Sequence, residues 1–195
     1  MRAPLMLTIV VLALSSFACG GDPPDKEIQQ AQSAVDAARL AGAEQYAAEE
    51  FRAATEALKN AKAAVEQRDY RLALNHALDS LERAQTAAQQ AAEGKATARA
   101  RAERALTAAT TAVSVAQTKL KAAEAARVPA RTLTGIRPLV ADATQRVQEA
   151  RTTFENGDFP SAATTASAAI ETLKTAIEKI DAATTPPARR RSPAR

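Results

Sequence analysis

The most constraining feature of this chain is an alanine-dominated apolar pattern that repeats every three or four residues. Hydrophobic residues make up 46% of the 195 residues, but aromatic residues make up only 3% and tryptophan is absent. A spacing of three and four places side chains on one face of a helix, whereas strands alternate every second residue. Because alanine buries little apolar area, the pattern favours closely packed helices over a thick globular core. We therefore predict an all-α fold.

Six apolar stripes of this kind follow one another along the chain. Gly42, Pro129 and Gly157 interrupt them with residues that end helices or form turns. Gly94 lies between the third and fourth stripes, but an isolated glycine costs a helix only about 1 kcal/mol. One long helix is therefore favoured over two separate helices, and Gly94 is the position where such a helix could kink. The stripes occupy residues 28–38, 51–65, 74–91, 106–123, 136–154 and 163–180.

A shift of 89 residues superposes the two halves of the chain. The Asp-Tyr pair at residues 69–70 then falls on the Asp-Phe pair at residues 158–159. Upstream, residues 37–39 match residues 125–127 at a shift of 88, which implies a one-residue insertion. Self-similarity at a fixed distance is the mark of a duplicated structural unit. We predict long antiparallel helices in a three-helix unit that is duplicated once, with helical unit 1 at residues 26–93 and helical unit 2 at residues 94–183.

The first 18 residues have the features of a bacterial signal peptide. Met1 and Arg2 supply a positive start, and residues 5–14 form an uncharged apolar run. A run of this length is too short to cross a bilayer, which takes about 20 helical residues. Residues 1–18 are therefore predicted to be a signal peptide rather than part of the fold.

Cys19 is the only cysteine and directly follows Ala18. A small residue before a cysteine, at the end of an apolar run, resembles a bacterial lipobox, although Ser16 stands where that motif usually has leucine. The resemblance implies cleavage before Cys19 and its modification with diacylglycerol and a further acyl chain such as palmitate. The alternatives are ordinary cleavage that leaves a free thiol, or an anchor that is never cut. On the lipobox interpretation, residues 19–25 comprise the lipidated cysteine and a flexible tether.

The first half of the chain also resembles a known family. The segments that carry the likeness are GAEQYA at residues 42–47, Phe51, Ala54, Leu58 and Ala61, and the turn DYRLA at residues 69–73. They resemble the alanine-rich domain of unknown function that is found in Gram-negative lipoproteins. The second half of the chain resembles the same family more weakly. Ala48 stands where that family usually has proline. The resemblance implies a helical lipoprotein domain and brings no activity with it.

The Asp-aromatic turn is also similar to the junction between the two helices of a tetratricopeptide repeat. It recurs after 89 residues, whereas a tetratricopeptide array has a period of about 34. We interpret the likeness as shared helical-hairpin geometry.

The formal net charge of +4 is misleading. Arg2 lies in the signal peptide, and Arg189, Arg190, Arg191 and Arg195 lie near the C-terminus, so subtracting these five leaves −1 for residues 19–185. A nucleic-acid-binding domain would carry a concentrated basic face. No nucleic-acid partner is therefore predicted, and residues 184–195 are predicted to be a disordered basic tail.

The sequence contains no recognisable catalytic constellation. His76 is the only histidine and has no cysteine partner for a metal site. Neither a Gly-x-Ser-x-Gly nucleophile motif nor a glycine-rich phosphate loop occurs. We predict a protein that is not an enzyme and has no cofactor or metal. The aromatic residues lie near helix breaks and are expected to close the bundle ends; the alternative is a partner-binding patch led by Tyr46 and Tyr70.

These features favour a membrane-anchored bacterial envelope lipoprotein that acts as a helical spacer, scaffold or protein-interaction module. The alternative is a helical carrier or binding module for a lipid or peptide in the periplasm. Gly20 follows the cysteine where inner-membrane lipoproteins commonly have aspartate, so the resemblance implies the outer membrane, with the protein facing the periplasm. The membrane, through Cys19, and an envelope protein are the expected partners. Alanine stripes serve bundles and intermolecular coiled coils alike, which leaves the oligomeric state open.

Overall fold

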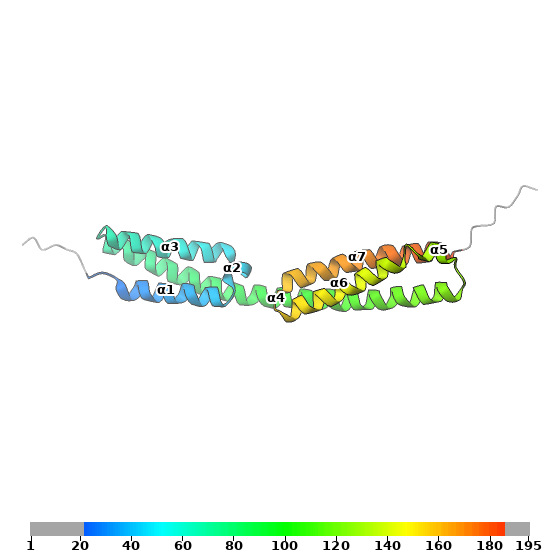
Figure 1. Cartoon of the computed structure of the whole chain (residues 1–195). Helices are drawn as coiled ribbons and strands as arrows, with labels where there is room; N and C mark the ends of the chain where they lie inside the picture. The colour runs from blue at the N-terminus through cyan, green and yellow to red at the C-terminus, as the bar shows by residue number, and fades with distance from the viewer. Residues whose placement is uncertain (1–21, 186–195) are drawn as a thin grey trace, which may run out of the picture. The chain divides into compact units, whose positions relative to one another are not determined.

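The computed structural model describes residues 22–185, which form helices and no strand (Figure 1). The all-α prediction is confirmed. The predicted signal peptide and Cys19 lie outside the described residues, as does the tail from residue 186 onward. The helices are α1 (Asp25–Leu40), α2 (Ala43–Tyr46), α3 (Ala48–Glu66), α4 (Tyr70–Ala125), α5 (Ala130–Leu133), α6 (Arg137–Glu155) and α7 (Phe159–Thr184).

The chain divides into two compact units, and α4 contributes to both. Unit 1 contains α1, α3 and the part of α4 up to Ala87. Unit 2 contains residues 41–47, with α2, and the chain from Ala88 onward. The predicted boundary between residues 93 and 94 lies inside α4, which is continuous over 56 residues and passes through Gly94. The predicted long central helix is thus confirmed.

Unit 1 is a three-helix bundle with an alanine core. Its helices lie side by side with alternating direction, as short connections require (Figure 1). The first two predicted stripes are buried in it, apart from one half-buried end residue in each, Ile28 and Val65. Because alanine lets the backbones approach closely, the buried Ser80 of α4 can donate its hydroxyl hydrogen to the carbonyl oxygen of Ala54 in α3, at 2.8 Å. The buried residues of α1 and α3 are Ala31, Val35, Ala38, Phe51, Ala54, Ala57, Leu58, Ala61 and Ala64.

Unit 2 packs α6 and α7 against the second part of α4. Larger aliphatic side chains, such as Leu133, Leu173 and Ile180, supplement the alanines here. Along α4 the alanines of the predicted stripe are fully buried, whereas Leu106 and Val113 between them are only half-buried. The alanines therefore face the centre of the bundle, and the larger residues flank it. The core cluster is Ala109, Ala116, Ala123, Leu133, Ile136, Val140, Ala143, Val147, Ala150, Ala166, Ala169, Leu173, Ala176 and Ile180.

The predicted duplication is visible in the helices themselves. α3 and α6 have 19 residues each and begin 89 residues apart, and α4 and α7 also begin 89 residues apart. The correspondence differs between α1 and the second part of α4. There the buried Ala31 and Ala38 correspond to the buried Ala116 and Ala123, a shift of 85 residues rather than the predicted 88. The connection from α4 to α6 is four residues longer than the connection from α1 to α3, which accounts for the change from 85 to 89.

The Asp-aromatic motif forms the same turn in both units. The chain reverses at Arg68 (φ 58°) and at Gly157 (φ 85°), residues in the left-handed region that ends many helices. The backbone N–H groups of these residues and of the next aspartate donate to carbonyl oxygens of the preceding helix, at 2.9 to 3.2 Å. Asp69 and Asp158 then cap the following helix, since each carboxylate accepts a backbone N–H three residues on, at 3.0 and 3.2 Å.

Candidate functional site

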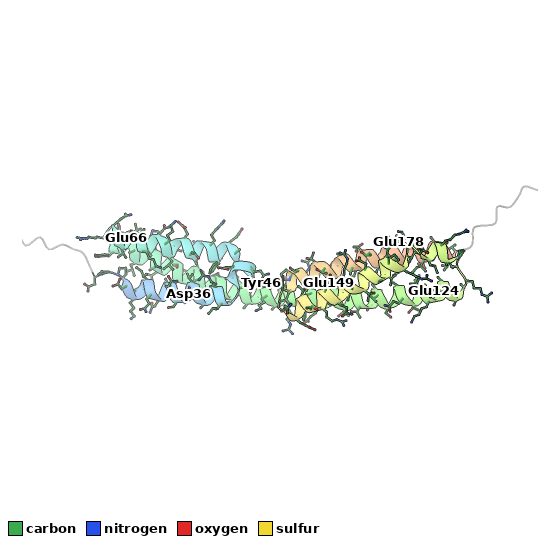
Figure 2. The ribbon with its side chains drawn as sticks, viewed as in Figure 1. Asp36, Tyr46, Glu66, Glu124, Glu149 and Glu178 are labelled. Carbon is green, nitrogen blue, oxygen red and sulfur yellow. The ribbon has the colours of Figure 1, made fainter. Side chains whose placement is uncertain are left out.

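Tyr46, a predicted partner-binding residue, lies at the end of α2 and packs against Gly94 of α4 within unit 2 (Figure 2). A Cβ atom built on Gly94 would lie only 3.1 Å from both the Cβ and the carbonyl oxygen of Tyr46. Glycine in the middle of α4 therefore lets the α2 backbone approach the helix closely. The sequence pattern around Gly94 indicated only a kink or a break in the helix.

The hydroxyl group of Tyr46 is buried, and it has no hydrogen-bond partner among the described residues. Burial, and then the negative charge of Asp158, raise the pKa of this hydroxyl above its ordinary value. The buried hydroxyl therefore offers a partner no surface, and Tyr46 as a whole is half-buried. This placement suits a packing role, like the one expected for the aromatic residues at the bundle ends.

The other aromatic residues lie where helices begin or end. Tyr70, the second predicted partner-binding residue, is the half-buried first residue of α4 in unit 1. Phe154 and Phe159 face each other across the α6–α7 turn, with ring centroids 5.1 Å apart. Phe51 lies near the start of α3, under the guanidinium of Arg39 at 5.4 Å. Each of these residues covers one end of a helix.

The structure assembles no metal centre in residues 22–185, since no group of three or more His, Cys, Asp or Glu side chains there could hold an ion. His76 is half-buried on α4. In the same part of the chain, no helix is both long enough and apolar enough to cross a membrane.

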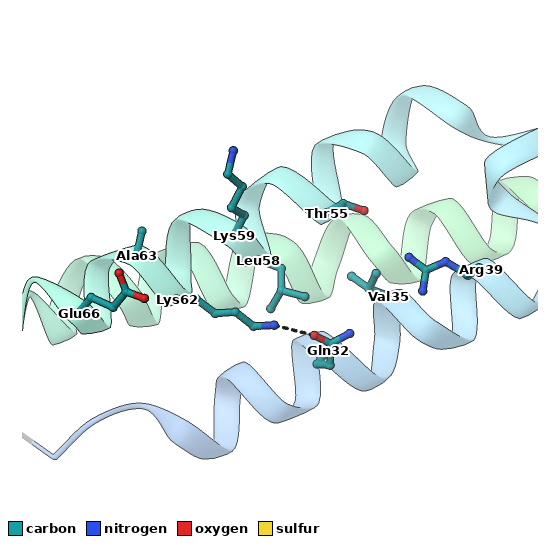
Figure 3. Close-up of a pocket in the computed structure, with 9 residues that line it drawn as sticks. All are labelled: Gln32, Val35, Arg39, Thr55, Leu58, Lys59, Lys62, Ala63 and Glu66. Carbon is teal, nitrogen blue, oxygen red and sulfur yellow. Dashed lines mark hydrogen bonds between the residues drawn. The ribbon is translucent and has the colours of Figure 1, made fainter.

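A groove lies between α1 and α3 of unit 1 (Figure 3). Its volume is about 430 Å³. Val35 and Leu58 point toward each other across its floor, while cationic side chains stand on its rim. The lining residues are Gln32, Val35, Arg39, Thr55, Leu58, Lys59, Lys62, Ala63 and Glu66.

Two of the cations are held in position by neighbouring side chains. The ammonium of Lys62 on α3 donates a hydrogen bond to the amide oxygen of Gln32 on α1, at 2.8 Å, and so bridges the groove. Arg39 forms an ion pair with Asp36 at 3.1 Å and also lies over the ring of Phe51. Both cations are therefore oriented before any ligand arrives.

The third cation, Lys59, extends outward from α3, 3.6 Å from Glu56. Ion pairs this exposed contribute little to stability, which leaves the lysine able to exchange its partner. This groove was not predicted from the sequence. A signal was present, because Lys59 and Lys62 are three residues apart and so share one side of the helix next to the stripe residue Leu58. Such spacing does not show which helix lies opposite.

Residues 26–102 match the model of a protein family described as "Domain of unknown function (DUF4398)". No curated protein and no solved structure matches the chain. The matched segment includes the groove, the Asp69 turn and the contact between Tyr46 and Gly94. It therefore contains nearly all the described residues of unit 1, together with α2 and the part of α4 that holds Gly94. This match confirms the resemblance of the first half of the chain to an alanine-rich domain of unknown function.

Proposed function

We propose that this chain is a membrane-anchored bacterial envelope lipoprotein, whose helical body acts without catalysis as a spacer, scaffold or protein-interaction module. Its anchor is the acylated Cys19, and its place is the outer membrane, facing the periplasm. The anchor rests on the sequence around Cys19, and the scaffold role rests on the architecture of the two bundles.

The observation that carries the scaffold role is the alanine packing of two bundles that share one helix. α4 supplies fully buried alanines to both units, for example Ala77 and Ala84 to unit 1 and Ala109 and Ala116 to unit 2. Alanine side chains at these positions bring the helix backbones together and fill the interior. Such a body presents most of its chemical variety on helix surfaces, which suits contact with other macromolecules.

The anchor is tested by replacing Cys19 with serine and labelling cells with an alkyne analogue of palmitate. The wild-type protein should be labelled and should sediment with membranes, whereas Cys19→Ser should lose both properties because it lacks the thiol that is acylated. Ser15→Ala is the matched control, since it changes the same segment and keeps Cys19. Equal labelling and membrane retention in Cys19→Ser would refute the lipid anchor.

The scaffold role is tested by crosslinking in intact envelopes followed by mass spectrometry. A scaffold should give the same protein crosslinks in repeated preparations, and those crosslinks should fall on the helix surfaces of residues 26–183. If the body is only a tethered bundle without a partner, its crosslinks should vary with protein abundance. That result would count against the interaction role.

The carrier alternative is favoured by a second hollow, of about 400 Å³, in unit 2. It lies where α5 and the end of α7 meet, and apolar side chains form much of its lining. Native mass spectrometry of the purified full chain distinguishes the two roles, because a carrier should retain a lipid or peptide of defined mass. The lining residues are Thr132, Gly135, Ile136, Lys179, Ala182 and Ala183.

A further inference from the structure

We propose that the groove between α1 and α3 binds an acidic amphipathic helix of a protein partner. This inference rests on the proposed interaction function and names the class of partner and the surface that receives it. A groove between two antiparallel helices is a common seat for a third helix, whose apolar face lies along the floor. Here Val35 and Leu58 supply the floor, and the rim supplies the charge.

The positive charge is concentrated in the groove and is not a property of unit 1 as a whole. The described residues of unit 1 contain 8 Lys and Arg against 11 Asp and Glu, a net charge of −3. The groove lining instead contains three cations, Arg39, Lys59 and Lys62, and one carboxylate, Glu66. A cationic groove on an acidic unit selects partners by local charge complementarity.

Lys62 is the side chain best placed to receive a carboxylate. An ammonium group has three N–H donors, and the one that Lys62 gives to Gln32 goes to a neutral amide oxygen. No carboxylate pairs with this ammonium among the described residues. An incoming glutamate would therefore gain a charge-assisted hydrogen bond without first breaking an ion pair.

The duplicated unit provides an internal comparison. Arg39 corresponds to Glu124, which already pairs with Arg137 at 2.9 Å, and Lys59 corresponds to Gln148. Of the three cations, only Lys62 has a cationic counterpart, Arg151. The counterpart of Glu66 is again a carboxylate, Glu155, so the four matching positions of unit 2 carry two carboxylates and one arginine. The two copies thus share their packing and differ in the charge of this groove.

A protein helix fits the groove better than a lipid does. Val35 and Leu58 are only 2% and 5% exposed, so the floor is a narrow apolar strip. Small side chains on one face of a helix can cover such a strip, whereas an acyl chain needs apolar surroundings along its whole length. The polar rim dominates, and Gln32 and Thr55 add hydrogen-bonding groups to it. A helix with glutamates beside small apolar residues matches this combination.

The test measures binding of a fluorescein-labelled helical peptide with glutamate and alanine on one face to the full, lipidated chain in detergent micelles. Fluorescence anisotropy compares the wild type with Lys59→Glu/Lys62→Glu and with the matched unit 2 variant Gln148→Glu/Arg151→Glu. We expect the first variant to weaken binding about tenfold or more, since attraction becomes repulsion, and the second to leave it within about twofold. A peptide with glutamine in place of glutamate should bind about tenfold more weakly, and added salt should weaken the glutamate peptide.

Three results of the peptide experiment would overturn the proposal: no binding of the glutamate peptide by the wild type, equal losses in both variants, or equal binding of the glutamine peptide. Vesicles of phosphatidylglycerol and phosphatidylcholine form a separate arm. If Lys59→Glu/Lys62→Glu abolishes vesicle binding but not peptide binding, the occupant is a lipid surface and the proposal fails. Membrane sedimentation of the same variant tests the anchor separately, so that failure of the peptide interaction and failure of the proposed anchoring give different results.

Discussion

Gly94 lies in the interior of α4, where two opposing effects decide what an added methyl group would do. Replacing a helical glycine with alanine stabilises a helix by about 0.8 to 1 kcal/mol, because glycine loses more backbone entropy on folding. The new Cβ atom would, however, lie 3.1 Å from the Cβ and the carbonyl oxygen of Tyr46. A separation this short forces one of the two backbones to move by a few tenths of an ångström.

The backbone of Tyr46 has little freedom to move. Ala43 is fully buried, and Ala47, which follows Tyr46, is 8% exposed, so α2 is packed at both ends. Forcing an extra methyl group into a packed contact costs about 1 to 3 kcal/mol. Setting this cost against the gain in helix propensity, we expect Gly94→Ala to lower the free energy of unfolding by about 1 kcal/mol.

The matched control is Ala96→Gly, at an exposed position two residues further along the same helix. It should destabilise the protein by about 1 kcal/mol through backbone entropy alone. Both variants are measured by urea unfolding followed by far-ultraviolet circular dichroism. If Gly94→Ala stabilises the protein by as much as Ala96→Gly destabilises it, then Tyr46 does not pack on Gly94 and the reasoning is refuted.

Three further predictions follow from buried or strained positions. Tyr46→Phe removes a buried hydroxyl without a partner and should stabilise the protein by about 1 kcal/mol. Because the pKa of Tyr46 is raised in the folded state, the stability of the wild type should be full below a pH of about 10 and fall above it. This fall should be absent in Tyr46→Phe and present in the control Tyr70→Phe. Ser80→Val should cost about 1 to 3 kcal/mol of stability by overpacking. Ser80→Ala should change the stability by less than about 1 kcal/mol, because the residue that corresponds to Ser80 in unit 2 is the buried Ala169. Equal effects of the two variants in thermal unfolding would contradict this. Arg68→Gly should stabilise the α3–α4 turn by about 1 kcal/mol, because Arg68 has a φ of 58°, a conformation that glycine adopts without strain. Gly157→Ala should destabilise the α6–α7 turn by a similar amount. A loss of stability in Arg68→Gly would count against the turn geometry.

Helical periodicity predicted the fold well where larger apolar residues mark one face. In α3 and α6, Phe51, Leu58, Val140 and Val147 identify the buried side, and all four are buried. In α4, alanine occurs on several faces, so periodicity alone could not select the inward one. Ala73, Ala87 and Ala102 are fully buried and were missed for this reason.

The close contacts of α4 could not be predicted because they depend on which segment lies opposite. Gly94 looked like a possible helix end, and only the position of Tyr46 explains why a glycine is needed there. The insertion between the two copies was likewise misjudged as one residue, because matching by sequence letters ignores which residues are buried. The correspondence of Ala31 with Ala116 and of Ala38 with Ala123 follows from burial.

The two units have the same buried positions, but they differ in the charge of the groove rim. Positions 51, 54, 58 and 61 are buried, as are their counterparts 89 residues later, because both bundles need the same inward face. The rim positions face no such constraint, and there Arg39 and Lys59 are replaced by Glu124 and Gln148. If the body served only as a spacer, charge on the rim would have no bearing on its task, and reversing it in either unit should be equally harmless in cells. If unit 1 binds an acidic helix, Lys59→Glu/Lys62→Glu should reduce its crosslinks to the partner while Gln148→Glu/Arg151→Glu preserves them.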